Sequence, residues 1–164
     1  MSPLLHHLLL ASANMPALYD QSDGALAQLL LCELQLAPSL PLFAPLPRDP
    51  ELAGLCRDFL AQPHIRSLPE NWARQLHRSQ RTFNRLFRQQ TGMSFAVWRQ
   101  QACLMAALPR LLSGSSVTRT ALELGYDSPG AFSSMFRKVL GQSPTAFVRA
   151  TTRQGKTAKP WFAD

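Results

Sequence analysis

The chain has 164 residues, of which 46% are hydrophobic, and its formal net charge at pH 7 is +7. This length suits one or two small domains and argues against a long repeat array or a large enzyme. Residues 66–153 hold thirteen arginines and lysines against three acidic side chains, whereas residues 1–65 hold two against six. The basic character therefore belongs to one segment, which predicts a polyanionic partner for that segment.

Several classes of protein are not indicated by any pattern in the chain. Cys32, Cys56 and Cys103 are odd in number and form no C-x-x-C pair, which predicts reduced, packed thiols. No histidine or cysteine spacing suits a metal, and no motif indicates a cofactor or a catalytic group. No apolar stretch is long enough to span a bilayer, and the apolar start lacks a basic n-region. We therefore expect a cytoplasmic protein that is not an enzyme and has no membrane, metal or cofactor.

The N-terminal third predicts short helices followed by a linker. Leucines recur at helical spacing in residues 3–13 and again in residues 25–36. Five prolines then follow between Pro38 and Pro50, and their fixed φ and missing N–H groups exclude a helix there. The expected organisation is a helical segment over residues 1–37, a proline-rich linker over 38–49, a domain over 50–150, and a basic, flexible tail over 151–164.

A helix-turn-helix unit is predicted at the start of the basic segment. After a helix over residues 50–62, a second helix buries Ala73 and Leu76 and ends in a short turn, and Ser79 is a suitable N-cap for the next helix. That helix, residues 80–90, turns its apolar side inward and four polar side chains outward, and Gly92 ends it. The inward residues are Phe83, Leu86 and Phe87; the outward residues are Arg81, Asn84, Arg85 and Arg88.

The same layout recurs with an offset of 49 residues. The cap, the aromatic residues and the terminal glycine all return: Ser79, Phe83, Phe87, Arg88, Gly92 and Ser94 reappear as Ser128, Phe132, Phe136, Arg137, Gly141 and Ser143. This internal repeat indicates two copies of one supersecondary unit. The four phenylalanines, together with Trp72 and Trp98, are predicted to be core residues.

A helix over residues 94–112 is predicted to join the two copies. Its length would be about 28 Å, which approaches the roughly 34 Å between successive major-groove faces of a duplex. Pro109 falls inside it and removes the hydrogen bond to Met105. We therefore expect either a bend there or a helix that stops near Leu108 and restarts.

These segments resemble a known family. The run SQRTFNRLFRQQTGMSF over residues 79–95 and the run LGYDSPGAFSSMFRKVLGQSP over residues 124–144 are similar to the DNA-binding domain of AraC/XylS-family transcription regulators. The resemblance covers about residues 50–150. It implies an all-α domain in which a central linker helix joins two helix-turn-helix subdomains, preceded here by a short helical segment. It also implies that one chain contacts two adjacent major-groove segments of double-stranded DNA.

The resemblance also implies roles for particular residues. In the first recognition helix Arg81, Asn84 and Arg85 match positions that approach base edges, and arginine and asparagine pair well with guanine and adenine. In the second, the matching positions are Pro129, Gly130, Ser133 and Ser134, of which Ser133 and Ser134 are expected to contact bases. Shorter side chains there predict that the second unit contributes mainly phosphate contacts and shape recognition. The expected phosphate contacts of both units are Arg78, Arg88, Ser128, Arg137 and Lys138.

The chain departs from the family in what precedes the domain. Many members carry an N-terminal effector-binding β-domain, and no strand-rich segment of that size is present in this sequence. We therefore expect a natural short form, a truncated product or a fragment of a longer regulator. Residues 1–37 are similar to helices that support dimer contacts in the family.

The sequence leads to one main hypothesis and one alternative. The main hypothesis is a sequence-specific DNA-binding transcription regulator, with the family suggesting activation through contact with RNA polymerase. The alternative is a protein-interaction module or dominant inhibitor, in which the leucine-rich residues 3–37 form a homodimer or pair with a full-length relative.

Overall fold

The computed structural model describes residues 27–32 and 40–156 of the chain. Within these residues every regular element is a helix, which confirms the predicted all-α fold class. The chain divides into two compact units, one made of residues 1–40 with 146–164 and the other of residues 41–145. The predicted repeat lies in residues 41–145. None of the helices in the described ranges is long and apolar enough to cross a membrane.

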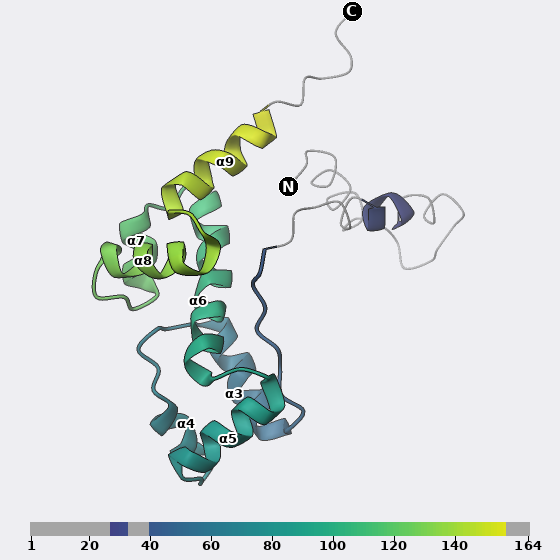
Figure 1. The fold of residues 1–164 in the computed structure, drawn as a ribbon, viewed down its shortest axis with the longest axis vertical. Coiled ribbons are helices and arrows are strands. Elements are labelled where there is room, and N and C mark those ends of the chain that lie inside the picture. Colours follow the sequence, from purple (N-terminus) through teal and green to yellow (C-terminus); the bar gives the residue numbers. More distant parts are fainter. Residues whose placement is uncertain (1–26, 33–39, 157–164) are drawn as a thin grey trace, which may run out of the picture. The chain divides into compact units, whose positions relative to one another are not determined.

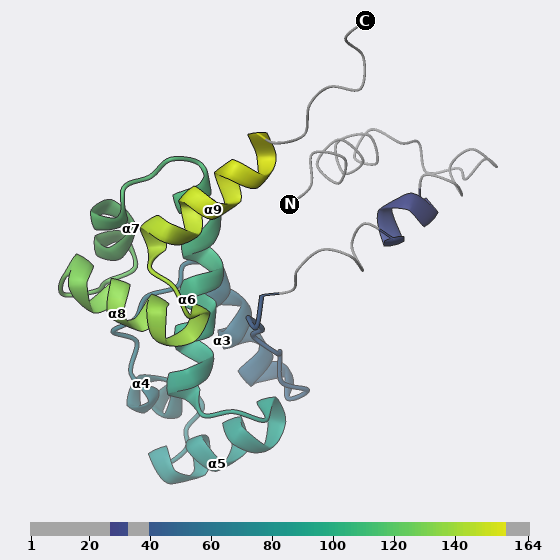
Figure 2. The ribbon, with the colours of Figure 1, turned by 45° about the horizontal axis from the view of Figure 1, so that its top comes forward.

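Two helix pairs flank a central helix in the unit of residues 41–145. Helix α3 (Pro50–Ala61) is followed by the pair α4 (Pro69–Gln75) and α5 (Gln80–Thr91). The central helix α6 (Phe95–Leu112) leads to the second pair, α7 (Val117–Glu123) and α8 (Pro129–Leu140). Figures 1 and 2 both show α4 and α5 at one end of α6, and α7 and α8 at the other end. We call α4 with α5 the first unit and α7 with α8 the second unit.

The predicted repeat is present in the backbone geometry as well as in the sequence. The Ser79 hydroxyl accepts from the Thr82 N–H at 3.2 Å, and the Ser128 hydroxyl accepts from the Ala131 N–H at 3.1 Å. Helices α5 and α8 end at Gly92 and Gly141, whose φ angles are 76° and 74°. Glycine is suited to this left-handed cap because it has no Cβ to clash with the backbone.

An aromatic cluster forms the core of the first unit. The Trp72 ring lies at the centre of this cluster, and its centroid is 4.8 Å from that of Phe95 and 6.0 Å from that of Trp98. Phe59, Phe83 and Phe87 complete the cluster around the same ring, with centroids 5.8 to 6.4 Å away. Most of these pairs meet edge to face, the arrangement that the charge distribution of aromatic rings favours. The prediction that these side chains are core residues is confirmed.

The second unit has a smaller aromatic core. Phe132 lies between Tyr126 and Phe136, with centroid distances of 5.3 and 5.7 Å. Phe132 and Phe136 are fully buried, like their counterparts in α5. The two units therefore use the same two aromatic positions to hold the second helix of each pair against the first.

Of the two alternatives expected for the central helix, the one in which it stops near Leu108 and restarts is wrong. Helix α6 runs without interruption from Phe95 to Leu112, with Pro109 inside it. Pro109 lies in the last turn, so its missing N–H removes one hydrogen bond after more than three turns have already formed. The carbonyl that loses its donor belongs to Met105, whose side chain is exposed, so water reaches that side of the helix. A bend at this position stays a prediction.

The proline-rich segment lies against the first unit over its described part. Residues 40–49 contain no helix or strand. The Trp98 indole N–H donates to the Pro45 carbonyl at 2.9 Å, and the Arg48 backbone N–H donates to the Gln90 side-chain carbonyl at 2.9 Å. These two hydrogen bonds attach the segment to α6 and to the end of α5.

The last helix extends past the expected end of the domain. Helix α9 spans Pro144–Lys156, so it continues for six residues into the segment for which a flexible tail was predicted. Of the two predicted N-terminal helices, only residues 27–32 are described, and they are helical. The remaining predictions for residues 1–26, 33–39 and 157–164 lie outside the described residues.

Candidate nucleic-acid interface

Helix α5 is strongly amphipathic. Phe83 and Phe87 are fully buried on its inner side, and the four polar side chains predicted to face outward are all exposed: Arg81, Asn84, Arg85 and Arg88. Spacings of three and four residues place these four on one face, because an α-helix repeats every 3.6 residues. In residues 27–32 and 40–156 no carboxylate forms an ion pair with any of the three arginines. The face is positive and uncompensated over this range.

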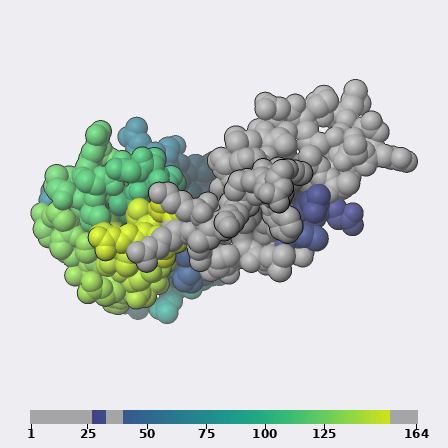
Figure 3. Space-filling view, turned by 90° about the horizontal axis from the view of Figure 1, so that it is seen from above, coloured from purple at the N-terminus to yellow at the C-terminus, as the bar shows by residue number. Residues whose placement is uncertain are grey.

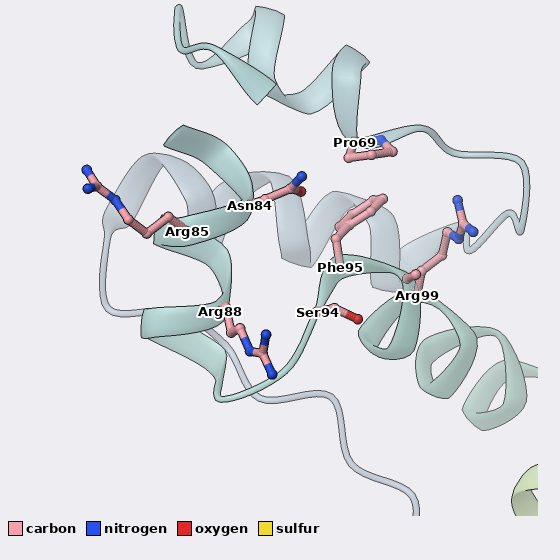
Figure 4. Close-up of a pocket in the computed structure, with 8 residues that line it drawn as sticks. Pro69, Asn84, Arg85, Arg88, Ser94, Phe95 and Arg99 are labelled. Carbon is pink, nitrogen blue, oxygen red and sulfur yellow. The ribbon is translucent and has the colours of Figure 1, made fainter. Parts of the chain in front are cut away.

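A pocket of about 490 Å³ lies between this face of α5 and the start of α6. Asn84 and Arg88 line it from α5, and the N-cap Ser94 and the first residue Phe95 line it from the start of α6. Figure 4 shows Arg88 and Arg99 on two sides of Ser94, whereas the Arg85 side chain extends away from the group. The pocket is open and basic, and the N-terminus of an 18-residue helix faces into it. Such a helix end favours an anion, since its first N–H groups have no partner within the helix.

Arg99 is held in place by contacts within the protein. Its guanidinium donates to the Ser67 carbonyl and lies 5.7 Å from the centroid of the Phe95 ring. A cation over an aromatic face is attracted by the negative charge of the π system. Arg99 therefore brings a fixed positive charge to the edge of the pocket, and sequence analysis did not single it out, because only the fold places it beside α5.

The second unit offers a different surface. Helix α8 begins with Pro129 and Gly130, and its outward positions include the exposed Ser134 and the half-buried Ser133. Its long basic side chains, Arg137 and Lys138, are exposed in the last turn. Figure 3 shows the residues of α7 and α8 as one continuous green surface. Short side chains at the start of α8 let the helix backbone approach a partner closely, whereas they offer few atoms for contacts to bases.

The remaining predicted site residues lie at the two turns. Arg78 is exposed directly before Ser79, in the turn between α4 and α5. Ser128 is exposed at the equivalent place before α8, and its hydroxyl is occupied as the N-cap acceptor. The structure thus places all the predicted site residues on the two recognition helices or at their N-terminal turns. The roles of these residues in contacts to bases and phosphates stay predictions.

Acidic groups of the second unit are paired with basic side chains. The Arg119 Nε atom donates to the Glu123 carboxylate at 2.8 Å, and Arg110 lies 3.5 Å from its other oxygen. The hydrogen bond from Arg119 lowers the pKa of the Glu123 carboxyl below its usual value. Asp127 pairs with Arg66 in the same way, at 2.5 Å. These pairs offset the negative charges close to α8.

No group of histidine, cysteine or acidic side chains in the described ranges could hold a metal ion. Cys56 and Cys103 are buried and free, and burial raises the pKa of each thiol to about 12. Thiols with such a pKa stay protonated and are poor nucleophiles at neutral pH. These two are packing residues, as the sequence predicts, whereas Cys32 is exposed, so the prediction of a packed thiol is wrong there.

The comparisons with known proteins agree with this architecture. A family profile described as a helix-turn-helix domain matches residues 72–150. The HTH-type transcriptional regulator NimR of Escherichia coli strain K12 is 36% identical to the chain over 162 residues. That match covers 97% of this chain and 59% of NimR, so the chain spans less than two thirds of this relative's length. The relative carries the name of a regulator, in agreement with the expectation that the chain is not an enzyme.

Solved structures show the same fold. The DNA-binding domain of the global transcriptional factor AdpA, solved in complex with a target DNA, is 32% identical with a TM-score of 0.58, and the match covers 65% of this chain and 96% of that domain. A transcriptional regulator with an AraC-type DNA-binding domain from Chromobacterium violaceum has a TM-score of 0.56 at 21% identity, with 66% of this chain and 96% of that chain covered. The second likeness concerns the fold alone. Together with the repeated helix pairs, the profile match and the 32% identity to the AdpA domain show that the chain belongs to the AraC-type helix-turn-helix family.

Proposed function

We propose that the chain regulates transcription by binding a specific sequence of double-stranded DNA through α5 and α8. The observation that carries this proposal is the uncompensated polar face of α5, which presents Arg81, Asn84 and Arg85 on a helix held rigidly by two buried phenylalanines. An α-helix fits the major groove, where each base pair presents its own pattern of donors and acceptors. The related AdpA domain was solved with its target DNA bound, which supports the same use of this fold here.

The proposed base contacts are unequal between the two units. Arginine and asparagine on α5 have the reach and the paired donors or acceptors that base edges require. Ser133 and Ser134 on α8 are short, and we expect them to contact bases only where the helix comes very close. Specificity should therefore be concentrated in the half of the DNA site that α5 contacts.

Backbone contacts are proposed for the rest of the basic surface. Arg88 and Arg99 at the pocket, with the N-terminus of α6, form a place where a DNA phosphate fits between α5 and the central helix. Arg78 and Ser128 at the two turns, and Arg137 and Lys138 at the end of α8, extend these contacts along the duplex. Each such contact releases counterions from the DNA, so the affinity should fall steeply as salt rises.

The length of α6 is compatible with contact to two groove segments by one chain. Its 18 residues extend over about 27 Å, and adjacent major-groove faces are roughly 34 Å apart. The two recognition helices lie beyond the two ends of this helix in sequence; α5 packs beside it directly, whereas α8 packs on α7, which contacts α6. A single chain should therefore occupy a bipartite, asymmetric site.

A selection of bound duplexes from a random pool tests this function directly. We expect one asymmetric motif that extends over two groove segments and is stronger in one half. Affinity for the selected motif should exceed that for random DNA at physiological salt. If no motif is recovered and binding disappears at that salt, the basic face attracts DNA only non-specifically and the proposal is wrong.

Activation is the finer part of the proposal. The resemblance to AraC/XylS regulators suggests that the chain activates promoters through contact with RNA polymerase, which would place it in the cytoplasm. A reporter gene downstream of the selected motif, transcribed in vitro with purified polymerase, tests this directly. Increased transcription on adding the protein is the expected result, and reduced transcription would identify a repressor.

A protein-interaction role is the alternative for the N-terminal segment. Residues 27–32 form a helical turn on which Leu29 and Leu31 are 53% and 58% exposed, and the NimR match extends over nearly the whole chain. These two leucines are two positions apart and lie on different sides of the helix, so the support for pairing is the leucine-rich sequence pattern of residues 3–37. Sedimentation of the chain with and without residues 3–37 distinguishes the cases: a dimer that becomes a monomer supports pairing, and a monomer in both contradicts it.

A further inference from the structure

The loop between α3 and α4, residues 62–68, contacts both helix-turn-helix units. The first unit holds it at Ser67, whose hydroxyl accepts from the Trp72 indole N–H at 3.0 Å. The Ser67 carbonyl accepts a hydrogen bond from the Arg99 guanidinium, which belongs to α6. Ser67 is therefore attached to the aromatic core of the first unit and to the central helix.

The preceding residues of the same loop contact the second unit. The Ile65 N–H donates to the Leu124 carbonyl at 2.8 Å, and Leu124 is the fully buried residue that ends α7. His64 lies directly against Gly125, so closely that a Cβ on that glycine would come within 2.2 Å of the imidazole. Gly125 also has a φ of 78°, so both its conformation and its contact with the loop require a residue without a side chain.

An ion pair completes the contact next to the second recognition helix. Arg66 and Asp127 approach to 2.5 Å, and their side chains are 64% and 84% exposed. Asp127 directly precedes Ser128, the N-cap of α8. A hydrogen bond, a close ring contact and an ion pair thus connect three consecutive loop residues to the turn that orients α8.

The central helix gives this contact a mechanical role. Helix α6 also connects the two units, and Pro109 removes one of its backbone hydrogen bonds in the last turn before the second unit. A helix is easier to bend where a hydrogen bond is missing. A second connection that lies beside α6 would limit bending at that point.

We propose that residues 62–68 act as a brace that fixes the orientation of α8 relative to α5 and thereby sets the spacing between the two DNA segments that the chain accepts. The effect on DNA spacing rests on the proposed function, whereas the effect of the loop on the orientation of α8 does not. The brace acts by positioning α8, and its residues need not contact DNA.

The first experiment measures the orientation without DNA. Spin labels are attached at Gln89→Cys on α5 and Ala131→Cys on α8, two exposed positions outside the proposed DNA contacts. Cys32→Ser removes the exposed native thiol, whereas Cys56 and Cys103 are buried and stay protonated. The distance between the labels is then measured by electron spin resonance in the full chain.

Charge variants test whether the loop restricts this distance. Arg66→Asp places two negative charges together, and the exchanged pair Arg66→Asp with Asp127→Arg restores attraction. Arg57→Asp on α3 is the matched control, with the same change of charge at an exposed site that has no ion pair among the described residues. We expect a narrow distance distribution in the parent and in Arg57→Asp, a broader one in Arg66→Asp, and a narrow one again in the exchanged pair. A narrow distribution that Arg66→Asp leaves unchanged overturns the proposal, as does a parent distribution that is already broad.

The second experiment uses the duplex motif selected by the unmodified chain. One base pair is added or removed between its two halves, and the loss of affinity is measured for each variant. Arg66→Asp should reduce the discrimination against these respaced sites by about two- to fivefold, the range expected for loss of an exposed ion pair. The exchanged pair should restore it, and Arg57→Asp should keep it.

The two experiments separate the brace from the proposed function. If no motif is recovered although Arg66→Asp broadens the distance distribution, sequence-specific binding is wrong and the inference about spacing fails with it, while the brace itself is supported. If a motif is recovered but the parent and all variants lose the same affinity when the spacing of the site is changed, the proposed function stands and the role of the loop in spacing is overturned.

Discussion

Replacement of Arg85 by alanine is the sharpest test of base recognition by α5. Arg85 is exposed, its side chain points away from Ser94 at the edge of the pocket in Figure 4, and it forms no ion pair with another described residue. Its removal should therefore change the free energy of unfolding by no more than about 0.5 kcal/mol, as for most surface substitutions. Any larger effect on DNA binding must come from the interface itself.

The expected loss follows from the chemistry of the contact. A well-placed arginine that pairs with one base contributes about 1 to 3 kcal/mol of discrimination, so affinity for the selected motif should fall about 5- to 150-fold. Affinity for random DNA should change little, because a base contact adds nothing to non-specific binding beyond one charge. A repeated selection with the variant should show relaxed preference at one base position.

Two variants provide the controls for this test. Arg57→Ala on α3 removes the same charge at an exposed site away from the recognition helices, and it should alter both affinities only slightly. Arg137→Ala in α8 removes a proposed phosphate contact, and it should weaken binding to the motif and to random DNA alike, with a shallower dependence on salt. Equal losses for Arg85→Ala on both kinds of DNA would refute the assignment of Arg85 as a base contact.

Three further predictions concern the stability of the fold. Gly141→Ala, at a φ of 74°, should lower the free energy of unfolding by about 1 to 2 kcal/mol, whereas Gly54→Ala inside α3 should raise it by about 0.5 to 1 kcal/mol. Urea titration measures both changes, and changes of the same sign in the two variants would contradict the cap assignment. Trp98→Phe removes the hydrogen bond to the proline-rich segment, so it should destabilise the domain by about 1 to 3 kcal/mol and increase protease cleavage within residues 40–49. An unchanged cleavage rate would show that this hydrogen bond does not hold the segment. Because the hydrogen bond from Arg119 lowers the pKa of the Glu123 carboxyl in the folded chain, the pair stabilises the fold above the unfolded pKa, and this stabilisation is lost as pH falls through the lower, folded pKa. The thermal unfolding temperature of Glu123→Gln should therefore differ from that of the parent at neutral pH and converge with it in acid. A difference that persists in acid would point to another cause.

Local signals in the sequence were sufficient for the helices, the caps and the two-fold repeat. Ser79 and Gly92 were predicted as the ends of α5, and both have the required geometry. Such features depend on residues within one or two turns, where a hydroxyl or a missing Cβ has a direct local effect. The outward face of α5 followed from helical periodicity alone, because burial of Phe83 and Phe87 determines where the other residues point.

Pro109 shows where a local rule was applied too strictly. The rule that proline ends a helix holds for an isolated interior position, yet α6 continues past it. The lost hydrogen bond is a small cost beside the burial of Ala107 and Leu111, which lie on one face of the helix before and after Pro109. Tertiary packing of one helix face thus outweighs a local preference.

Contacts between segments far apart in the chain were decided by the tertiary structure alone. The sequence by itself determined the family, the all-α class and the polar face of α5, since these depend on periodicity and on motifs of neighbouring residues. It contained no signal for Arg99 beside the pocket, for the attachment of Trp98 to Pro45, or for the pairing of Arg66 with Asp127. Arg66 and Asp127 are 61 positions apart and lie in loops, where no repeating pattern fixes the direction of a side chain. Only the packing of both units on α6 brings such residues together, and for that reason the orientation of the two recognition helices is a property of the folded chain.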